Sequence, residues 1–194
     1  MTLLRAFLAS EFPGSLQDAI QKATSDLRKT LGDDLVRWVP THNIHLTLKF
    51  LGDVSPANLD LIKQMLATEA AQYSAFDVDV EGIGSFPNSR RPRVIWVGLN
   101  APAALASLQH SIETGAARLG YESEERGFSP HLTIGRVRQN ASSSDVQKIR
   151  AALEATKVGK LGTAHINAVH LFKSDLQPTG SVYTKLFSAP LNHS

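Results

Sequence analysis

Hydrophobic residues along the chain follow two periods. Short segments that alternate or run apolar are typical of β-strands, and longer segments with an apolar residue every three or four positions predict helices with one buried face. The expected strands cover residues 3–10, 35–39, 43–51, 76–82, 93–99, 131–137, 164–174 and 182–188. The expected helices cover residues 13–32, 55–73, 105–119 and 143–157.

Tight turns join several of the expected strands. One example is "DLQPTG" at residues 175–180, which follows one strand and precedes the next. Connections this short favour antiparallel pairing. The second half of the chain repeats the plan of the first, with helices between strands. We therefore expect an α+β protein, a single compact domain of residues 1–194, with two similar lobes of mainly antiparallel sheet and helices outside.

Composition narrows the class of protein. The 194 residues are 42% hydrophobic and 20% charged, as in ordinary globular proteins. No segment approaches the roughly 18 apolar residues that a membrane helix needs, so no membrane association is expected. Cysteine is absent, which excludes disulfides and cysteine nucleophiles, and a cytoplasmic location is the default expectation. The net charge of +2 permits a polyanionic partner without requiring one.

One short motif occurs twice, as "HLTL" at residues 45–48 and "HLTI" at residues 131–134. A single histidine two residues before a threonine is common by chance. Two copies with the same leucine between them, at comparable places in two similar halves, are unlikely to arise by chance. Both copies lie in expected strands, where every second side chain faces the same way. The side chains expected to share the faces of the two histidines are His45, Thr47, Lys49, His131 and Thr133.

Two histidines on one surface suit a reaction that moves two protons. The imidazole pKa is ordinarily near 6.5, so one ring can be neutral while the other is charged. Displacement at phosphorus needs such a pair, because a base must deprotonate the attacking oxygen and an acid must protonate the leaving one. The threonine hydroxyls can donate to the non-bridging oxygens. The residues alone leave open which histidine is the acid.

These motifs resemble those of the 2H phosphoesterase superfamily, and most closely those of the RNA 2′,3′-cyclic phosphodiesterases, also called 2′-5′ RNA ligases. The resemblance covers nearly the whole chain and includes "RAFLA", "WVPTHNIHLTLKFLG", "RRPRVIWVGL", "FSPHLTIGRV" and "LFKSDLQPTGSVY". It implies a bilobal fold whose lobes are related by pseudo-twofold symmetry. It also implies an active-site cleft between the lobes that holds both motifs.

The resemblance further implies a role for each motif residue. His45 would be the general acid that protonates O3′, and His131 the general base that activates water, with Thr47 and Thr133 beside them. The reaction would open a terminal 2′,3′-cyclic phosphate of RNA to a 2′-phosphate without a metal or cofactor. Relatives can also join RNA ends reversibly through a 2′-5′ linkage without ATP.

Several other side chains are candidates for substrate binding. Arg136 follows the second motif, although alternation places it opposite His131 unless Gly135 bends or bulges the strand. Phe50 is expected on the face opposite His45, whereas Phe128 precedes the second strand and could stack on a base. The remaining candidates are Lys49 in the first motif strand, Arg90, Arg91 and Arg93 in a basic loop, and Tyr183 beyond the "QPTG" turn.

Two other functions compete with hydrolysis at RNA ends. The same chemistry could act on a small cyclic nucleotide, and the fold could serve as a non-catalytic module that binds RNA ends. The basic loop favours RNA over a small nucleotide, and paired histidines favour catalysis over binding alone. His42 and His45 have no evident third ligand, so no metal site is expected. We expect a monomer that acts on RNA ending in a 2′,3′-cyclic phosphate.

Overall fold

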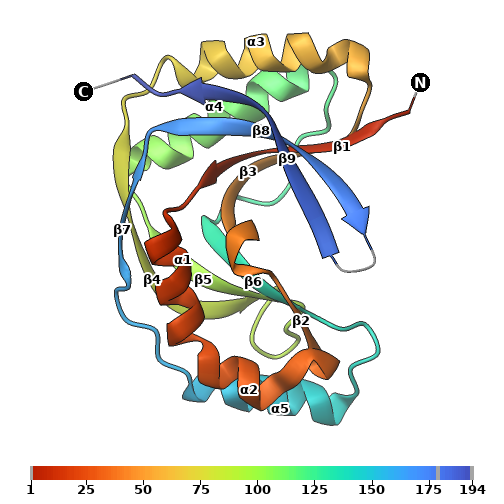
Figure 1. The fold of residues 1–194 in the computed structure, drawn as a ribbon, viewed down its shortest axis with the longest axis vertical. Helices are drawn as coiled ribbons and strands as arrows, with labels where there is room; N and C mark the ends of the chain where they lie inside the picture. Colours follow the sequence, from red (N-terminus) through yellow and green to blue (C-terminus); the bar gives the residue numbers. More distant parts are fainter. Residues whose placement is uncertain (1, 178–179, 193–194) are drawn as a thin grey trace.

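The computed structural model describes residues 2–177 and 180–192, which form one curled antiparallel sheet with helices at both ends (Figure 1). The sheet order is β7-β4-β5-β6-β3-β1-β8-β9, and β2 pairs with β6. The strands are β1 Leu4–Glu11, β2 Val36–Trp38, β3 His45–Val54, β4 Phe76–Phe86, β5 Val94–Asn100, β6 His131–Val137, β7 Gly162–Ile166, β8 Ala168–Gln177 and β9 Gly180–Pro190. The helices are α1 Gly14–Ala23, α2 Ser25–Leu35, η1 Thr41–Asn43, η2 Pro56–Asn58, α3 Leu59–Ala70, α4 Ala103–Arg118 and α5 Ser143–Ala155.

The structure confirms the α+β class and the antiparallel sheet, and it divides two of the expected elements. The helix expected at 13–32 is two helices that meet at Thr24, and Gly32 interrupts the second with a φ of 62°. The strand expected at 164–174 is also two, because the chain leaves β4 and joins β1 at residue 167. β8 and β9 pair as expected, although positions 178–179 of their turn lie outside the described residues.

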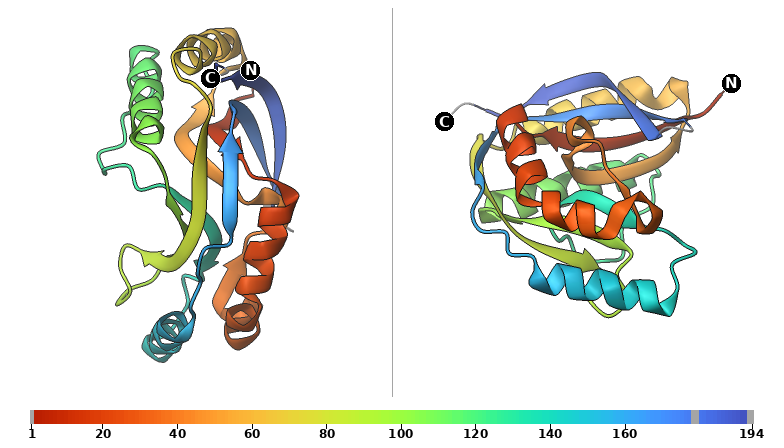
Figure 2. Two further views of the ribbon diagram at one scale, coloured as in Figure 1. Left: turned by 90° about the vertical axis from the view of Figure 1, so that its left-hand side faces the viewer. Right: turned by 60° about the horizontal axis from the view of Figure 1, so that its bottom comes forward.

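The sheet consists of two lobes with the same strand arrangement. The His45 lobe runs outward from the centre as β3, β1, β8 and β9, and the His131 lobe as β6, β5, β4 and β7, with β2 beside β6. Helices α3 and α4 lie at the end of the His45 lobe, and α2 and α5 at the other end (Figures 1 and 2). Each lobe takes elements from both halves of the chain, so the two lobes are not the two halves of the sequence.

The main hydrophobic core lies between the sheet and the helices. Leu46 and Leu132 from the two motif strands are fully buried in it, together with Ile62 of α3 and Leu108 of α4. Burying one such side chain stabilises the fold by about 1.5–3 kcal/mol. The opposite face of the sheet carries both histidine motifs and is called here the motif face. No helix of the described residues is long and apolar enough to span a membrane.

Candidate active site

The two motifs meet at the centre of the sheet. β3 and β6 pair antiparallel at a single position, where Leu46 lies opposite Leu132. Neighbouring residues on antiparallel strands pair in opposite order. This register places His45 beside Thr133 and Thr47 beside His131, all on the motif face. The middle leucines of the two motifs are therefore the pair through which the two central strands meet, and the polar pairs are related by an approximate twofold axis through it.

Each histidine is held by a backbone carbonyl two residues earlier. Nδ1 of His45 lies 2.7 Å from the carbonyl oxygen of Asn43, and Nδ1 of His131 lies 2.7 Å from that of Ser129. A carbonyl oxygen can only accept, so Nδ1 carries the proton and donates it in both rings. In a neutral ring, Nε2 carries no proton and can act as a base. In a protonated ring, Nε2 carries a proton and can act as an acid.

Aromatic side chains hold both imidazoles in place. Phe7 stacks on His45 with ring centroids 4.9 Å apart, and Tyr183 meets the same imidazole edge-on at 5.3 Å. Phe86 meets His131 edge-on at 4.8 Å. These contacts fix the direction of each ring, and the structure brings Tyr183 to His45 as the sequence suggested. Phe86 could not be predicted from the sequence, because it lies at the end of a strand with no motif around it.

The pKa values of both histidines lie below the ordinary value of 6.5. Burial is the main cause of the lower pKa in both rings, since it disfavours the charged form. The positive charge of Arg136 lowers both pKa values further. The backbone carbonyls of Asn43 and Ser129 act in the opposite direction, as does the carboxylate of Glu11 at His45. Both imidazoles are therefore favoured in the neutral form when no anion is bound.

A β-bulge follows each motif and reverses the alternation of side chains. In β3, Leu8 of β1 lies opposite Lys49 while Ala9 lies opposite Thr47, so Leu48 has no partner. In β6, Ile95 of β5 lies opposite Gly135 while Trp96 lies opposite Thr133, so Ile134 has no partner. An extra residue in one strand turns the following side chains to the other face. Both bulges lie three residues after a motif histidine, so they obey the same pseudo-symmetry.

The predictions that Lys49 shares the face of His45 and that Phe50 lies opposite are both wrong, because of the first bulge. Lys49 is only 5% exposed and forms an ion pair with Glu113 of α4, 2.5 Å away. Its ammonium also donates to the backbone carbonyl of Glu122. Phe50 is 64% exposed, and its ring lies 6.2 Å from that of Phe7, next to His45. Lys49 therefore links the sheet to helix α4, which covers it. Phe50 lies on the motif face, where Lys49 was expected.

The second bulge brings Arg136 to the motif face, as the next side chain after Thr133 along β6. Arg136 is the pseudo-symmetric counterpart of Phe50, because each lies five residues after its motif histidine. The two lobes therefore present different chemistry at equivalent positions. The His45 lobe offers an exposed aromatic ring, and the His131 lobe offers a guanidinium that can bind phosphate.

The structure places the other residues predicted to bind substrate in different parts of the molecule. Arg93 lines an open groove together with Arg136, whereas Arg90 and Arg91 are exposed in the β4–β5 loop, where their backbone amides donate to the Asn88 side chain. Phe128 is half-buried and packs against the main core. Among the described aromatic contacts, Phe128 has none with His45 or His131. Arg37 also lines the groove, and it could not be predicted from the sequence because it lies in a three-residue strand outside both motifs.

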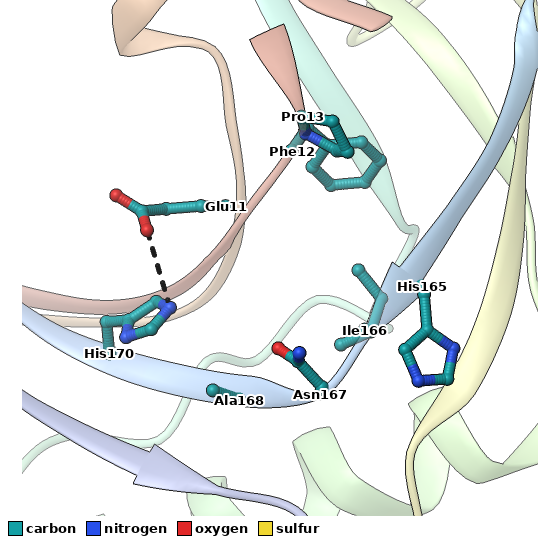
Figure 3. Close-up of a pocket in the computed structure, with 8 residues that line it drawn as sticks. All are labelled: Glu11, Phe12, Pro13, His165, Ile166, Asn167, Ala168 and His170. Atoms are coloured by element: carbon teal, nitrogen blue, oxygen red, sulfur yellow. Dashed lines mark ion pairs between the residues drawn. The ribbon is translucent and has the colours of Figure 1, made fainter. Parts of the chain in front are cut away.

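A second depression, of about 320 Å³, is lined by residues 11–13, by residues 165–168 and by His170 (Figure 3). Glu11 lines it and lies directly across β1–β3 from His45. The Glu11 carboxylate is 2.5 Å from Lys185 Nζ and 3.6 Å from His170 Nε2. Burial lowers the pKa of His170, so Lys185 is the main positive partner of Glu11. These contacts hold the carboxylate at one edge of the site, where its charge favours the protonated form of His45.

The motif hydroxyls remain available to a ligand. Neither Thr47 nor Thr133 has a side-chain hydrogen bond to any residue that the structure describes. No group of three or more histidine and acidic side chains that could hold a metal occurs in residues 2–177 and 180–192. The site as described is two neutral imidazoles, two free hydroxyls and one guanidinium on one face. This set can accept a proton, donate a proton and bind phosphate oxygens.

Comparison with known proteins identifies similar chains. A family model described as the 2′-5′ RNA ligase superfamily matches residues 12–178. The RNA 2′,3′-cyclic phosphodiesterase of Methanothermobacter thermautotrophicus is 32% identical and covers 94% of this chain and 96% of its own. The protein of the same name from Methanocaldococcus jannaschii is also 32% identical, and covers 93% and 96%.

Solved structures share the fold over the whole chain. A protein of Thermus thermophilus superposes with a TM-score of 0.80 at 26% identity, and the match covers 97% of this chain and 98% of that one. E. coli LigT complexed with 3′-AMP superposes with a TM-score of 0.75 at 25% identity, over 98% and 99% of the two chains. The fold of this chain is therefore shared with these proteins.

Proposed function

Because the chain belongs to the 2′-5′ RNA ligase superfamily, we propose that it opens the terminal 2′,3′-cyclic phosphate of RNA and leaves a 2′-phosphate. One observation carries this proposal: the two His-Leu-Thr motifs meet across the Leu46–Leu132 pair. This pairing gives a phosphate one imidazole on each side, which an in-line displacement requires. An RNA substrate also fits the cytoplasmic location expected from the sequence.

The residues act in one concerted sequence. Nε2 of His131 takes a proton from water, whose oxygen attacks phosphorus and forms a new P–O bond. The bond from phosphorus to O3′ breaks, and Nε2 of His45 gives its proton to O3′. The hydroxyls of Thr47 and Thr133 donate to the non-bridging oxygens, where negative charge gathers. Joining of RNA ends follows the same steps with a ribose hydroxyl in place of water.

The lower histidine pKa values suit this reaction. His131 must be neutral to act as a base, and its low pKa keeps it so. His45 must be protonated, and a bound phosphate supplies the negative charge that favours its imidazolium. Glu11 adds to this effect on the His45 side only.

The two lobes carry different side chains at equivalent positions, so they make different contacts with the substrate. Arg136 binds a non-bridging oxygen, and Phe50 offers its exposed ring to the terminal base. Tyr183 supports His45 from the same side. One chain supplies both motifs, so we propose that the monomer is active.

The test incubates the protein with RNA that ends in a 2′,3′-cyclic phosphate, with a chelator present, and identifies the product as a 2′- or 3′-phosphate. We expect a 2′-phosphate, with turnover at least a hundredfold lower for His45→Ala and for His131→Ala, since general acid–base catalysis contributes about 10²–10⁴-fold. Turnover of a cyclic mononucleotide with none of RNA would favour the small-nucleotide alternative. Tight binding of the RNA end without turnover would favour the binding module.

A further inference from the structure

Four arginines line one open groove next to the histidine pair. The groove has a volume of about 880 Å³ and lies where the end of β6 runs beside β2 and the start of β5. None of the eight described residues that line it is acidic. The net charge of the whole chain is only +2, so this concentration of positive charge is local. The polar residues that line the groove are Arg37, Arg93, Arg136, Arg138, Gln139 and Asn140.

Two of these arginines lie side by side. Arg37 of β2 is directly opposite Arg136 of β6, so two guanidinium groups leave one face at neighbouring positions, and like charges placed in this way are destabilising. In residues 2–177 and 180–192, no ion pair includes any of the four arginines. Within the same residues only Arg138 has a side-chain hydrogen bond, to the backbone carbonyl of Asp33. An anion in the groove would relieve this repulsion, and arginine binds phosphate through two parallel hydrogen bonds.

The groove adjoins His45, although Arg136 belongs to the His131 lobe, because β3 and β6 run in opposite directions. Their register places Thr133 beside His45. Arg136 is the next side chain of β6 on the motif face, roughly 7 Å beyond Thr133. Arg37 lies at the same end of the site, because its strand β2 leads through η1 directly into His45.

The other end of the site carries an exposed aromatic ring. Phe50 follows Thr47 on the motif face of β3, and Thr47 lies beside His131. Phe50 is therefore beyond His131, as the arginines are beyond His45. A ligand that spans the two histidines meets positive charge at one end and an aromatic ring at the other.

The covalent structure of a ribose 2′,3′-cyclic phosphate relates these two ends to the parts of one nucleotide. O3′ and the 5′ carbon are attached to neighbouring ring atoms, C3′ and C4′. O2′ and the base are attached to the other neighbouring pair, C2′ and C1′. When O3′ lies at His45, the 5′ side of the ribose faces the His45 end and the base side faces the Phe50 end. An RNA strand continues from its terminal nucleotide through the 5′ oxygen, so its next phosphates lie toward the arginines.

We propose that the arginine groove binds the backbone phosphates that precede the terminal nucleotide in the strand that carries the cyclic phosphate. The enzyme therefore prefers an oligonucleotide to a cyclic mononucleotide, because only an oligonucleotide reaches the groove. These contacts are remote from the reacting atoms and equally strong before and in the transition state, so they lower KM and leave kcat unchanged. This inference rests on the proposed function and on its assignment of His45 as the acid.

The test measures kcat and KM for substrates that differ in their preceding phosphates. They are a nucleoside 2′,3′-cyclic phosphate and a tetranucleotide that ends in the same group. For wild type we expect kcat/KM to be at least about tenfold higher for the tetranucleotide, since hydrogen bonds to charged groups are the strong ones. Arg37→Gln and Arg93→Gln should each lower kcat/KM for the tetranucleotide about fivefold through KM, and change that for the mononucleotide less than twofold.

The charge of the RNA backbone is tested separately from its length. A tetranucleotide whose linkages are uncharged methylphosphonates should react only as well as the mononucleotide and should be insensitive to both substitutions. With the natural linkages, the dependence of 1/KM on salt should weaken by about 0.7 in the log–log slope for each phosphate contact removed. Arg37→Lys keeps the positive charge, so it should keep most of that slope.

Arg118→Gln is the matched control, because Arg118 is exposed on α4, at the other end of the molecule (Figure 1). It should change neither substrate's kinetics. Arg37→Gln should leave the urea midpoint unchanged or raise it, because it removes the repulsion from Arg136.

Equal kcat/KM for the two substrates in wild type would overturn the inference, as would equal losses for both substrates in the Arg37 and Arg93 variants. Full activity of these variants on the tetranucleotide, or of wild type on the methylphosphonate strand, would also overturn it. Failure of wild type to open any cyclic phosphate would instead refute the proposed function.

Discussion

The exchange of Lys49 and Phe50 across the sheet can be tested by comparing stability with activity. We expect Lys49→Met to destabilise the protein and to leave the chemistry intact. The Lys49 side chain is 4% exposed and its partner Glu113 is 14% exposed, so the substitution leaves a largely buried carboxylate without its cation. Removing one partner of a buried ion pair costs about 3–5 kcal/mol.

The lower end of that range applies here, about 3 kcal/mol. Glu113 keeps some contact with water, and it still accepts the backbone N–H of Glu124 at 2.9 Å. For a chain of this size the free energy of unfolding falls by about 3 kcal/mol per M urea. The urea midpoint of Lys49→Met should therefore drop by about 1 M. The double variant Lys49→Met/Glu113→Leu should recover part of this loss, because no unpaired buried charge remains.

Phe50→Ala should show the opposite pattern. A side chain that is 64% exposed contributes little to stability, so the midpoint should hardly move. Loss of base stacking, worth about 1–3 kcal/mol, should lower kcat/KM for a cyclic-phosphate RNA by about tenfold or more. Both variants are assayed for kcat/KM at a temperature where they are folded. Lys49 would instead belong to the motif face if Lys49→Met lowered kcat/KM as Phe50→Ala does and left the urea midpoint unchanged.

Four further outcomes follow from the site. The pH profile of kcat/KM should be bell-shaped with its maximum below 6.5, because burial lowers the pKa of both histidines; a maximum above 6.5 would contradict this. Arg136→Gln should move both limbs to higher pH, since its charge lowers both pKa values. Glu11→Gln should move only the limb of His45, the alkaline one, to lower pH; movement of both limbs would mean that Glu11 acts through the fold. Leu46→Ala should cost about 2–5 kcal/mol in urea unfolding and also lower kcat/KM, because it loosens the contact between the lobes. Leu8→Ala, equally buried in β1, is the control and should lower stability with a smaller effect on kcat/KM.

Local patterns were sufficient for the parts of the fold that depend on nearby residues. The two motif strands, the α+β class and the hairpin of β8 and β9 were all predicted from periodicity and turn residues. The expected helix at 13–32 and strand at 164–174 each proved to be two elements. The second division depends on which distant strand each segment pairs with, and periodicity carries no information about that.

The sequence by itself determined the two histidine–threonine pairs, because two matching motifs are informative without any structure. It also indicated that Arg136 could face the site only if the strand bent or bulged at Gly135, and the structure has the bulge at Ile134. The tertiary structure decided that both motif strands contain that bulge, so that Lys49 is buried and Phe50 is exposed. It also decided that Arg37 lies opposite Arg136, and that Leu46 meets Leu132 to join the lobes. The physical reason is that side-chain direction follows backbone register, and register is set by pairing between strands far apart in the chain.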